Sequence, residues 1–308
     1  MKINLSMDVE DILGDPYLNN SVIEEICAFC HKEKIYCDLY MTGMRYEQLD
    51  DTNNDLINFI ESSDYLEIGY HTNTHSFKTI PQITFNMDMD EINAIKLYEE
   101  RKYNPIDDTF SSSGGLSKMK SRLKLVGFRA PNYAWTPQFL KYIHSYDFKV
   151  NTMDIKFNKA FLFMDMLNLP VISKPLEAML SLDEVEDSLK GYEAVSLFLH
   201  PSRIIYDEFW DKKKERGIHS DWQDRLKNVE YIFKQLSMKY ELVGLKYLNY
   251  SYHNNTTMKF ASDSAFELLS NSIKSKWTWS QLPKYFFDKK AIELCRIYSN
   301  TFMPVNLL

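Results

Sequence analysis

Two histidines four residues apart form the first group of side chains that could do chemistry. His71 and His75 bound the segment HTNTH, which follows an apolar run ending at Tyr70. If the chain turns into a helix there, both imidazoles can converge on one ion, and their nitrogens suit a Zn²⁺ ion that keeps an open position for water. Histidine pairs at this spacing also arise by chance, so the pair alone indicates either a metal site or two ordinary loop residues.

Three carboxylates follow the first apolar run of the chain. Asp8, Glu10 and Asp11 lie in the segment SMDVED. Neighbouring carboxylates repel one another unless a cation or an arginine compensates them. Alone, such a cluster is typical of a solvated turn or a helix cap. Beside a histidine pair, it could supply an anionic metal ligand and a general base.

An arginine and a third histidine end two further apolar runs. Arg129, in the segment GFRAPNY, could bind a carboxylate through two parallel hydrogen bonds. A surface arginine before a turn bounded by Pro131 is the commoner meaning of that pattern. His200, in the segment LFLHP, offers a general acid near neutral pH. A lone histidine after a core strand is more often structural.

The elements that must position these residues alternate between strand and helix along the chain. Strands are predicted at 2–9, 35–42, 65–70, 123–130, 148–153, 169–173, 194–199 and 240–245, and helices at 20–33, 52–62, 88–103, 137–146 and 221–238, with a surface loop at 104–122. Repeated strand–helix units predict a parallel sheet covered by helices, and seven or eight strands favour a distorted (β/α) barrel. Chemistry in such barrels collects at the carboxyl ends of the strands. The residues at those ends are Asp8, His71, Arg129, Asp154 and His200.

Length and composition fit one barrel with an appendage. The chain has 308 residues, of which 44% are hydrophobic, and its net charge of −7 disfavours nucleic acid as a partner. Residues 1–250 are predicted to form the catalytic barrel. Residues 251–308 are expected to form a helical, aromatic-rich appendage that packs on the barrel. Its mixture of lysines and aromatic residues at 276–290 leaves a weak contact with a membrane surface open.

Export and membrane signals are absent from the sequence pattern. The first residues, MKINLSMDVED, lack the apolar region of a secretory signal, and the chain contains no apolar run of 18 or more residues. The sequence therefore predicts a cytoplasmic protein with no transmembrane segment. It gives no indication of the oligomeric state.

The order of these segments resembles that of the polysaccharide deacetylases, the NodB-homology group also called carbohydrate esterase family 4. SMDVED is similar to the first, acidic motif of the family, HTNTH to its second, FRAPNY to its third and LFLHP to its fifth. The resemblance covers about residues 1–250. It implies a metal-dependent hydrolase that removes an N-acetyl group from an amino sugar.

The resemblance also implies a role for each residue. His71, His75 and one carboxylate would hold Zn²⁺, with Co²⁺ or Ni²⁺ as alternatives. The metal would acidify a bound water, and Asp8 would take its proton while Arg129 keeps Asp8 ionised and oriented. The backbone N–H of Asn132 would help to stabilise the oxyanion. His200 would protonate the leaving amine.

Two positions depart from the family pattern. Where the family has two adjacent Asp residues, the second acid here is Glu10 or Asp11. Strand alternation places Glu10 on the same face as Asp8, whereas a turn after Val9 could bring Asp11 in, and Asp11 is the preferred ligand. The fourth motif of the family usually has an Asp followed by Trp that tunes the catalytic histidine. Here Asp154 is followed by Ile, so Asp154 is a candidate partner of His200.

Other functions remain compatible with the sequence. The substrate expected first is a saccharide or glycoconjugate intermediate of surface-polysaccharide biosynthesis, by analogy with the family. The same scaffold could hydrolyse another C–N amide bond, such as that of a formamide or a cyclic ureide. A catalytically inactive, carbohydrate-binding relic is disfavoured because the acids, the histidine pair, Arg129 and His200 are all present.

Overall fold

The computed structural model describes most of the chain. The described residues are 1–10, 15–74, 99–104, 109–111, 113–131, 142–152, 160–163, 166–179, 181–206, 217–252 and 303–304. The strands are β1 (Lys2–Val9), β2 (Cys37–Met41), β3 (Leu66–Tyr70), β4 (Tyr103–Asn104), β5 (Thr109–Phe110), β6 (Gly127–Arg129), β7 (Val150–Thr152), β8 (Phe161–Phe163), β9 (Met166–Leu169), β10 (Ala194–Leu199), β11 (Glu241–Leu242) and β12 (Met303–Pro304). The helices are α1 (Pro16–Glu33), α2 (Gly43–Thr52), α3 (Asn54–Ser62), α6 (Gly115–Arg122), α8 (Leu182–Ser188), α9 (Pro201–Ile205), α10 (Trp222–Lys239), α11 (Leu245–Tyr252) and the 3-10 helix η2 (Leu176–Ala178).

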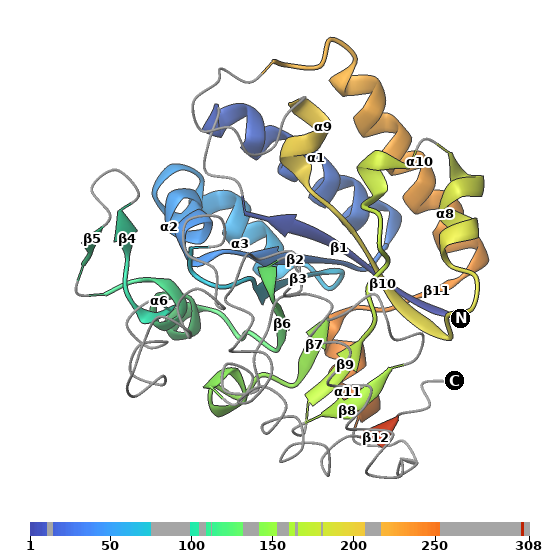
Figure 1. The fold of residues 1–308 in the computed structure, drawn as a ribbon. Coiled ribbons are helices and arrows are strands. Elements are labelled where there is room, and N and C mark those ends of the chain that lie inside the picture. The colour runs from blue at the N-terminus through green and yellow to red at the C-terminus, as the bar shows by residue number, and fades with distance from the viewer. Residues whose placement is uncertain are drawn as a thin grey trace, which may run out of the picture.

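Within the described ranges, seven parallel strands follow one another in the order β10-β1-β2-β3-β6-β7-β9. The short strand β11 also pairs parallel with β1. A parallel bridge between Val171, just after β9, and Ser196 of β10 links the two ends of this order. Outer helices cover the sheet, with α1 and α10 on the same side of β1 and β10 (Figure 1). The predicted distorted (β/α) barrel is therefore confirmed.

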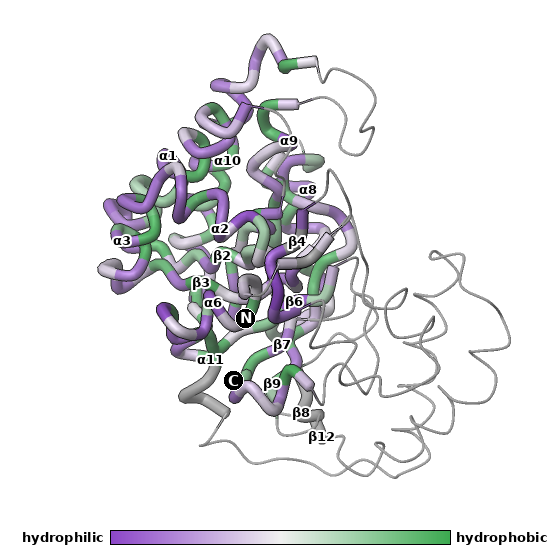
Figure 2. Tube along the Cα trace, turned by 90° about the vertical axis from the view of Figure 1, so that its left-hand side faces the viewer, coloured by the Kyte–Doolittle hydropathy of each residue, from purple (hydrophilic) through white to green (hydrophobic). Residues whose placement is uncertain are grey.

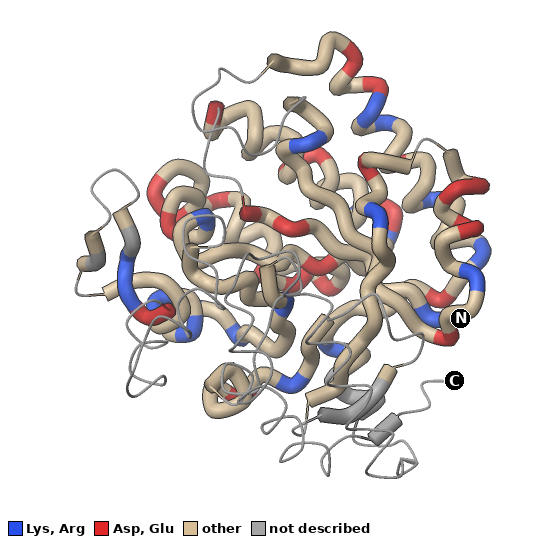
Figure 3. Tube along the Cα trace, viewed as in Figure 1, with Lys and Arg blue, Asp and Glu red and all other residues tan. Residues whose placement is uncertain are grey.

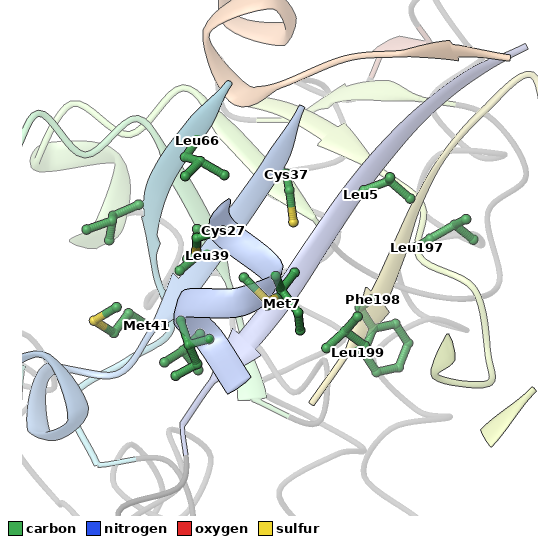
Figure 4. Close-up of a cluster of buried hydrophobic side chains, with 14 of the residues drawn as sticks. Leu5, Met7, Cys27, Cys37, Leu39, Met41, Leu66, Leu197, Phe198 and Leu199 are labelled. Carbon is green, nitrogen blue, oxygen red and sulfur yellow. The ribbon is translucent and has the colours of Figure 1, made fainter. Parts of the chain in front are cut away.

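The hydrophobic core lies mainly between the sheet and the outer helices. Odd-numbered residues of β1 point to this side, as strand alternation requires. Figure 4 shows Leu5 and Met7 together with Leu39 of β2 and Cys27 of α1. The helices that cover the sheet mix hydrophobic and hydrophilic residues along their length (Figure 2), as expected for helices with one buried face.

The opposite face of the strands points into the barrel and is unusually polar. Its buried polar residues include Asn4, Ser6 and Asp8 of β1, Asp38 of β2, Arg129 of β6, Thr152 of β7 and Ser196 of β10. A smaller apolar cluster fills the remainder of the interior, and it includes Tyr40, Val150, Leu167 and, from the start of α11, Leu245 and Leu248. Helix α11 thus packs against the barrel interior at the amino ends of the strands.

Several elements differ from the sequence prediction. Helix α2 was not predicted, and the predicted loop at 104–122 is wrong because it contains α6, whose Leu116 and Met119 are fully buried. Two buried apolar side chains on one helical turn are enough to dock so short a helix. Strand β8 pairs antiparallel with β9, which the sequence pattern did not indicate.

Other predictions fall mostly outside the described residues. These include the helix at 88–103 and most of the helix at 137–146. Of residues 251–308, the structure describes the end of α11 and β12, which pairs antiparallel with β8. Among the described helices, none combines the length and the apolar character needed to cross a membrane.

Candidate active site

The candidate site begins where β1 ends inside the barrel. Alternation along β1 places Ser6 and Asp8 on the inner face, and Glu10 follows in the same alternation. All three side chains are buried. Figure 3 shows acidic residues grouped at the carboxyl end of β1, in contrast to the mixed charges along α10. The site is therefore rich in buried carboxylate oxygen.

Arg129 lies at the centre of the barrel and is fully buried. Its guanidinium forms an ion pair with Asp8, and its Nη2 donates to the hydroxyls of Ser6 and Ser196, each at 2.8 Å. Its Nε donates to the hydroxyl of Thr152 at 2.7 Å. A buried charge is tolerated only when it is paired and hydrogen-bonded in this way. Arg129 is thus fixed as the counter-ion of Asp8.

An aromatic ring completes the environment of this guanidinium. The Cζ atom of Arg129 lies 4.1 Å from the centroid of the Tyr40 ring, within the range of a cation–π contact. Burial raises the pKa of Tyr40, so the ring stays neutral. The pair of Arg129 and Asp8 is therefore locked on several sides, which orients the carboxylate before any ligand binds.

His71 joins the site directly after β3. Its Nδ1 lies 2.8 Å from the backbone oxygen of Arg129, and a carbonyl oxygen can only accept, so Nδ1 carries a proton. Its Nε2 lies 3.0 Å from Oε2 of Glu10. When the ring is neutral, Nε2 is an acceptor, as is the carboxylate oxygen of Glu10. Two acceptors cannot form a hydrogen bond with each other, so the contact requires either a proton or a cation between the two atoms. This donor set fits a metal ion held by Nε2 of His71 and a carboxylate oxygen.

The turn after His71 is held in an uncommon backbone conformation. Thr72 has φ of 62°, which is unfavourable for a β-branched residue. Its carbonyl accepts from the N–H of Gly43 at 2.9 Å, and the N–H of Asn73 donates to the buried Glu99 at 3.0 Å. A Cβ at Gly43 would lie 2.3 Å from Oδ1 of Asn73, so glycine is required for this close approach.

Glu99 also accepts a hydrogen bond from Tyr70, the residue before His71. Burial raises the pKa of Glu99 to about 7, although both hydrogen bonds act in the opposite direction. The carboxylate thus ties the end of β3 to the turn that follows it. The surrounding hydrogen bonds stabilise the strained backbone at Thr72, and strained turns of this kind are common at functional sites.

His200 reaches the site from the end of β10. Its Nδ1 donates to Oε1 of Glu177 at 2.8 Å, and its backbone N–H donates to Oε2 of the same residue at 3.2 Å. Its Nε2 lies 3.8 Å from Oε1 of Glu10. Burial alone would lower the pKa of His200, but Glu177, Glu10 and Asp8 outweigh it and raise the pKa. His200 is thus favoured as a proton donor.

A small pocket opens beside these groups. It is lined by Asp8, Val9, Glu10, Asn19, Ile23, Arg45, Pro201 and Ser202. It lies where the end of β1 meets the first turns of α1, α2 and α9. Both inner carboxylates of this strand end therefore line a space about large enough for a water molecule.

The structure brings together every predicted site residue that it describes. Asp8, Glu10, His71, Arg129 and His200 form one connected set of contacts. Four further predicted residues lie outside the described residues, namely Asp11, His75, Asn132 and Asp154. Within the described ranges, no three His, Cys, Asp or Glu side chains gather as a complete metal site. The set of His75 with His71 and a carboxylate stays a prediction.

Sequence reasoning missed several members of the site. Ser6 and Ser196 are polar residues inside the apolar runs NLSMDV and AVSLFLH, and this break in a buried strand was the available signal. Glu177 had no such signal, because it lies in a short 3-10 helix in an irregular stretch before α8. Its role became visible only from its contacts with His200.

Comparisons with known proteins support the fold. No protein-family model and no curated protein matches the sequence. Among solved structures, a candidate polysaccharide deacetylase from Mycobacterium smegmatis matches with a TM-score of 0.55 at 11% identity, over 82% of this chain and 90% of that one. A 4-alpha-glucanotransferase from Thermococcus litoralis matches with a TM-score of 0.52 at 10% identity; the match covers 97% of this chain but only 46% of the glucanotransferase. The predicted resemblance to the polysaccharide deacetylases is therefore confirmed at the level of the fold.

Proposed function

We propose that the protein is a metal-dependent hydrolase that removes an N-acetyl group from an amino sugar. The observation that carries the proposal is the contact between Nε2 of His71 and Glu10, beside the ion pair of Asp8 and Arg129. Two residues that could bind a metal, His71 and Glu10, lie beside the carboxylate of Asp8 and the imidazole of His200. All of them lie at the carboxyl ends of parallel strands. In (β/α) barrels that end carries the chemistry. The polysaccharide-deacetylase fold agrees with it.

Two described residues would hold the metal. The hydrogen bond from Nδ1 of His71 to the Arg129 carbonyl leaves Nε2 as the ligand atom, which is the usual arrangement around a metal-bound histidine. Contact with His71 favours Glu10 over Asp11 as the carboxylate ligand. His75 is the expected third ligand, and the ion is Zn²⁺, with Co²⁺ or Ni²⁺ as alternatives. When bound, the metal would polarise the acetyl carbonyl and lower the pKa of a water.

Asp8 is the proposed general base. One of its oxygens pairs with Arg129, which orients the carboxylate, and Asp8 also lines the pocket. It can therefore take a proton from a water in that pocket. Arg129 is already engaged by three hydroxyls and Asp8, so it acts on Asp8 rather than on the substrate.

His200 is the proposed general acid. Its raised pKa favours the protonated form, and Nδ1 is already bound to Glu177. The Nε2 proton is then the one that can pass to the departing amine of the sugar. The backbone N–H of Asn132 is proposed to stabilise the oxyanion. The products are acetate and a free amino sugar.

The substrate class follows from the same chemistry. An N-acetylated saccharide or glycoconjugate intermediate of surface-polysaccharide biosynthesis is the proposed substrate. The fold shared with a candidate polysaccharide deacetylase supports this choice of substrate. Hydrolysis of a formamide or a cyclic ureide would need the same base and acid. Activity assays on N-acetylated sugars and on these other amides therefore distinguish the two substrate classes.

Elemental mass spectrometry of the purified protein tests the metal. The wild type is expected to bind about one ion per chain, and His71→Ala and His75→Ala are expected to lose it. His144→Ala is the matched control, because this histidine interacts with Asp147, which precedes the amino end of β7, whereas the site lies at the carboxyl ends. A wild type that holds no ion and takes none up on addition would contradict the proposal and favour the inactive, carbohydrate-binding alternative.

Three isosteric substitutions then identify the carboxylate ligand and the general base. Glu10→Gln is expected to reduce the metal content, whereas Asp11→Asn is expected to retain it. Asp8→Asn is expected to keep the metal and to lower the rate of acetate release from N-acetylglucosamine oligosaccharides by about 10²- to 10⁴-fold, the usual contribution of a general base. An active Asp8→Asn variant would show that Asp8 is not the base.

A further inference from the structure

One carboxylate binds His200 at two points. Oε1 of Glu177 accepts from Nδ1 of the ring at 2.8 Å, and Oε2 accepts from the backbone N–H of the same histidine at 3.2 Å. Both oxygens of one side chain thus engage both ends of one residue. This two-point contact fixes the ring relative to its own backbone, since rotation of the ring would break the shorter bond.

The element that carries Glu177 is itself held firmly. Helix η2 is closed by the bonds Ala178 N–H to Pro175 O (3.0 Å) and Met179 N–H to Leu176 O (2.9 Å). Leu176 and Met179 are buried in the core, and only 4% of the Glu177 side chain is exposed. Glu177 is therefore placed by packing, independently of any ligand.

The other neighbours of His200 complete its orientation. The Phe198 ring lies edge-on to the imidazole with 5.4 Å between centroids. Arg203, one turn further along α9, places Nη1 3.8 Å from Oε1 of Glu177. With Nδ1 bound to Glu177, Nε2 points to Glu10 on the side of the candidate metal ligands. The carboxylate therefore decides which nitrogen faces the reacting centre.

We infer that Glu177 is the positioning residue of His200, a role for which the sequence pattern offers only Asp154. The inference rests on the proposed function, because it assumes that Nε2 of His200 delivers the proton. In this chain the carboxylate would come from η2, immediately ahead of α8, rather than from Asp154. Within the described residues, the carboxylate of Glu177 makes its polar contacts with His200 and Arg203, and it acts through the histidine.

The test follows the Nδ1 proton of His200 by NMR in the full chain labelled with ¹⁵N-histidine. The wild type is expected to show an Nδ1–H resonance protected from exchange with water. Glu177→Leu removes the acceptor and should abolish this resonance, whereas Glu177→Gln keeps an oxygen acceptor and should restore it at a shifted position. Asp154→Asn is the matched control and should leave the resonance unchanged.

Kinetics on N-acetylglucosamine oligosaccharides give the second readout. Glu177→Leu should lower kcat for acetate release by about 10- to 100-fold with little change in KM, as for other carboxylates that orient a functional histidine, and Glu177→Gln should recover part of it. A resonance that survives Glu177→Leu, or that Asp154→Asn abolishes, overturns the inference. If Glu177→Leu does not fold, an unshifted resonance in Glu177→Gln overturns it. If the wild type releases no acetate, the proposed function is wrong. The NMR experiment still shows in that case whether Glu177 accepts the Nδ1 proton of His200.

Discussion

Buried carboxylates lie at both ends of the barrel interior, but their hydrogen-bonding partners differ. At the carboxyl end of β1, Asp8 is paired with the guanidinium of Arg129. At the amino end, Asp38 contacts the amide of Asn4 and, at 3.4 Å, the backbone N–H of Leu245 at the start of α11. A guanidinium keeps its charge at any accessible pH, whereas amides are neutral donors.

This difference determines what each end can do. Burial, followed by the neighbouring Glu67, raises the pKa of Asp38 well above its usual range. Glu67 in turn accepts the N–H of Lys246 at 2.9 Å, so both acids cap the first turn of α11. The amino end is thus a structural cap. The carboxyl end holds a carboxylate paired with a guanidinium, close to two histidines, and this arrangement suits proton transfer.

The strongest test of the comparison is removal of the buried cation. Arg129→Met should leave Asp8 buried without its counter-ion and lower the free energy of unfolding by about 3–5 kcal/mol. Urea unfolding followed by circular dichroism measures the loss. The double variant Arg129→Met with Asp8→Asn should be more stable than the single variant, because no unpaired charge remains. A loss below about 1 kcal/mol in Arg129→Met would show that the pair contributes little to the fold.

A smaller effect is expected from the acid at the other end. Because the folded pKa of Asp38 is raised, the protonated carboxyl is the form that folding favours. Its contribution is therefore fully present below the unfolded pKa, about 4, and is lost as the pH rises through the folded pKa. The side chain in Asp38→Asn stays neutral at every pH. The free energy of unfolding of this variant should therefore fall less than that of the wild type over that pH range, and the two decreases should differ by at least about 1 kcal/mol.

Urea unfolding at a series of pH values measures this difference. The exposed Asp64→Asn is the control, and its pH dependence should match that of the wild type. Parallel pH profiles for wild type and Asp38→Asn would mean that Asp38 is ionised in the folded protein. The buried carboxylates at the two ends of the barrel would then be in the same protonation state, and the proposed difference between the ends would be wrong.

The smallest effect is expected for the cation of the amino end. Nζ of Lys246 lies 3.4 Å from Oε1 of Glu67, but 68% of the lysine side chain is exposed. Exposed ion pairs contribute about 0–1 kcal/mol, so Lys246→Met should change the free energy of unfolding by no more than that. The backbone bond from residue 246 to Glu67 is retained in the variant. A loss as large as that of Arg129→Met would remove the distinction between a buried and an exposed cation.

Much of the frame of the site could be predicted from the sequence. Apolar runs ending in Asp8, His71, Arg129 and His200 predicted strands whose carboxyl ends meet, and the structure places these residues in contact. This works because parallel strands in one sheet share a common end, so that a residue at the end of one strand lies near the end of the next. The alternation along β1 likewise predicted that Glu10 shares the face of Asp8.

The short elements could not be predicted in the same way. Helices α2 and α6 have few apolar positions and no sustained period, so they depend on packing against neighbours that the sequence does not reveal. The positive φ of Thr72 depends in the same manner on bonds from Gly43 and Glu99. Local propensity opposes this conformation, and tertiary contacts override it.

The sequence by itself determined the alternating strand–helix pattern, the inward face of β1 and the residues that end the strands. Only the tertiary structure decided which partner each of them receives. Arg129 pairs with a carboxylate 121 residues away, and Glu177 rather than a strand-end residue binds His200. The physical reason is that the type of a side chain sets the bonds it can form, whereas packing of the whole barrel sets which atoms come within 3 Å of it.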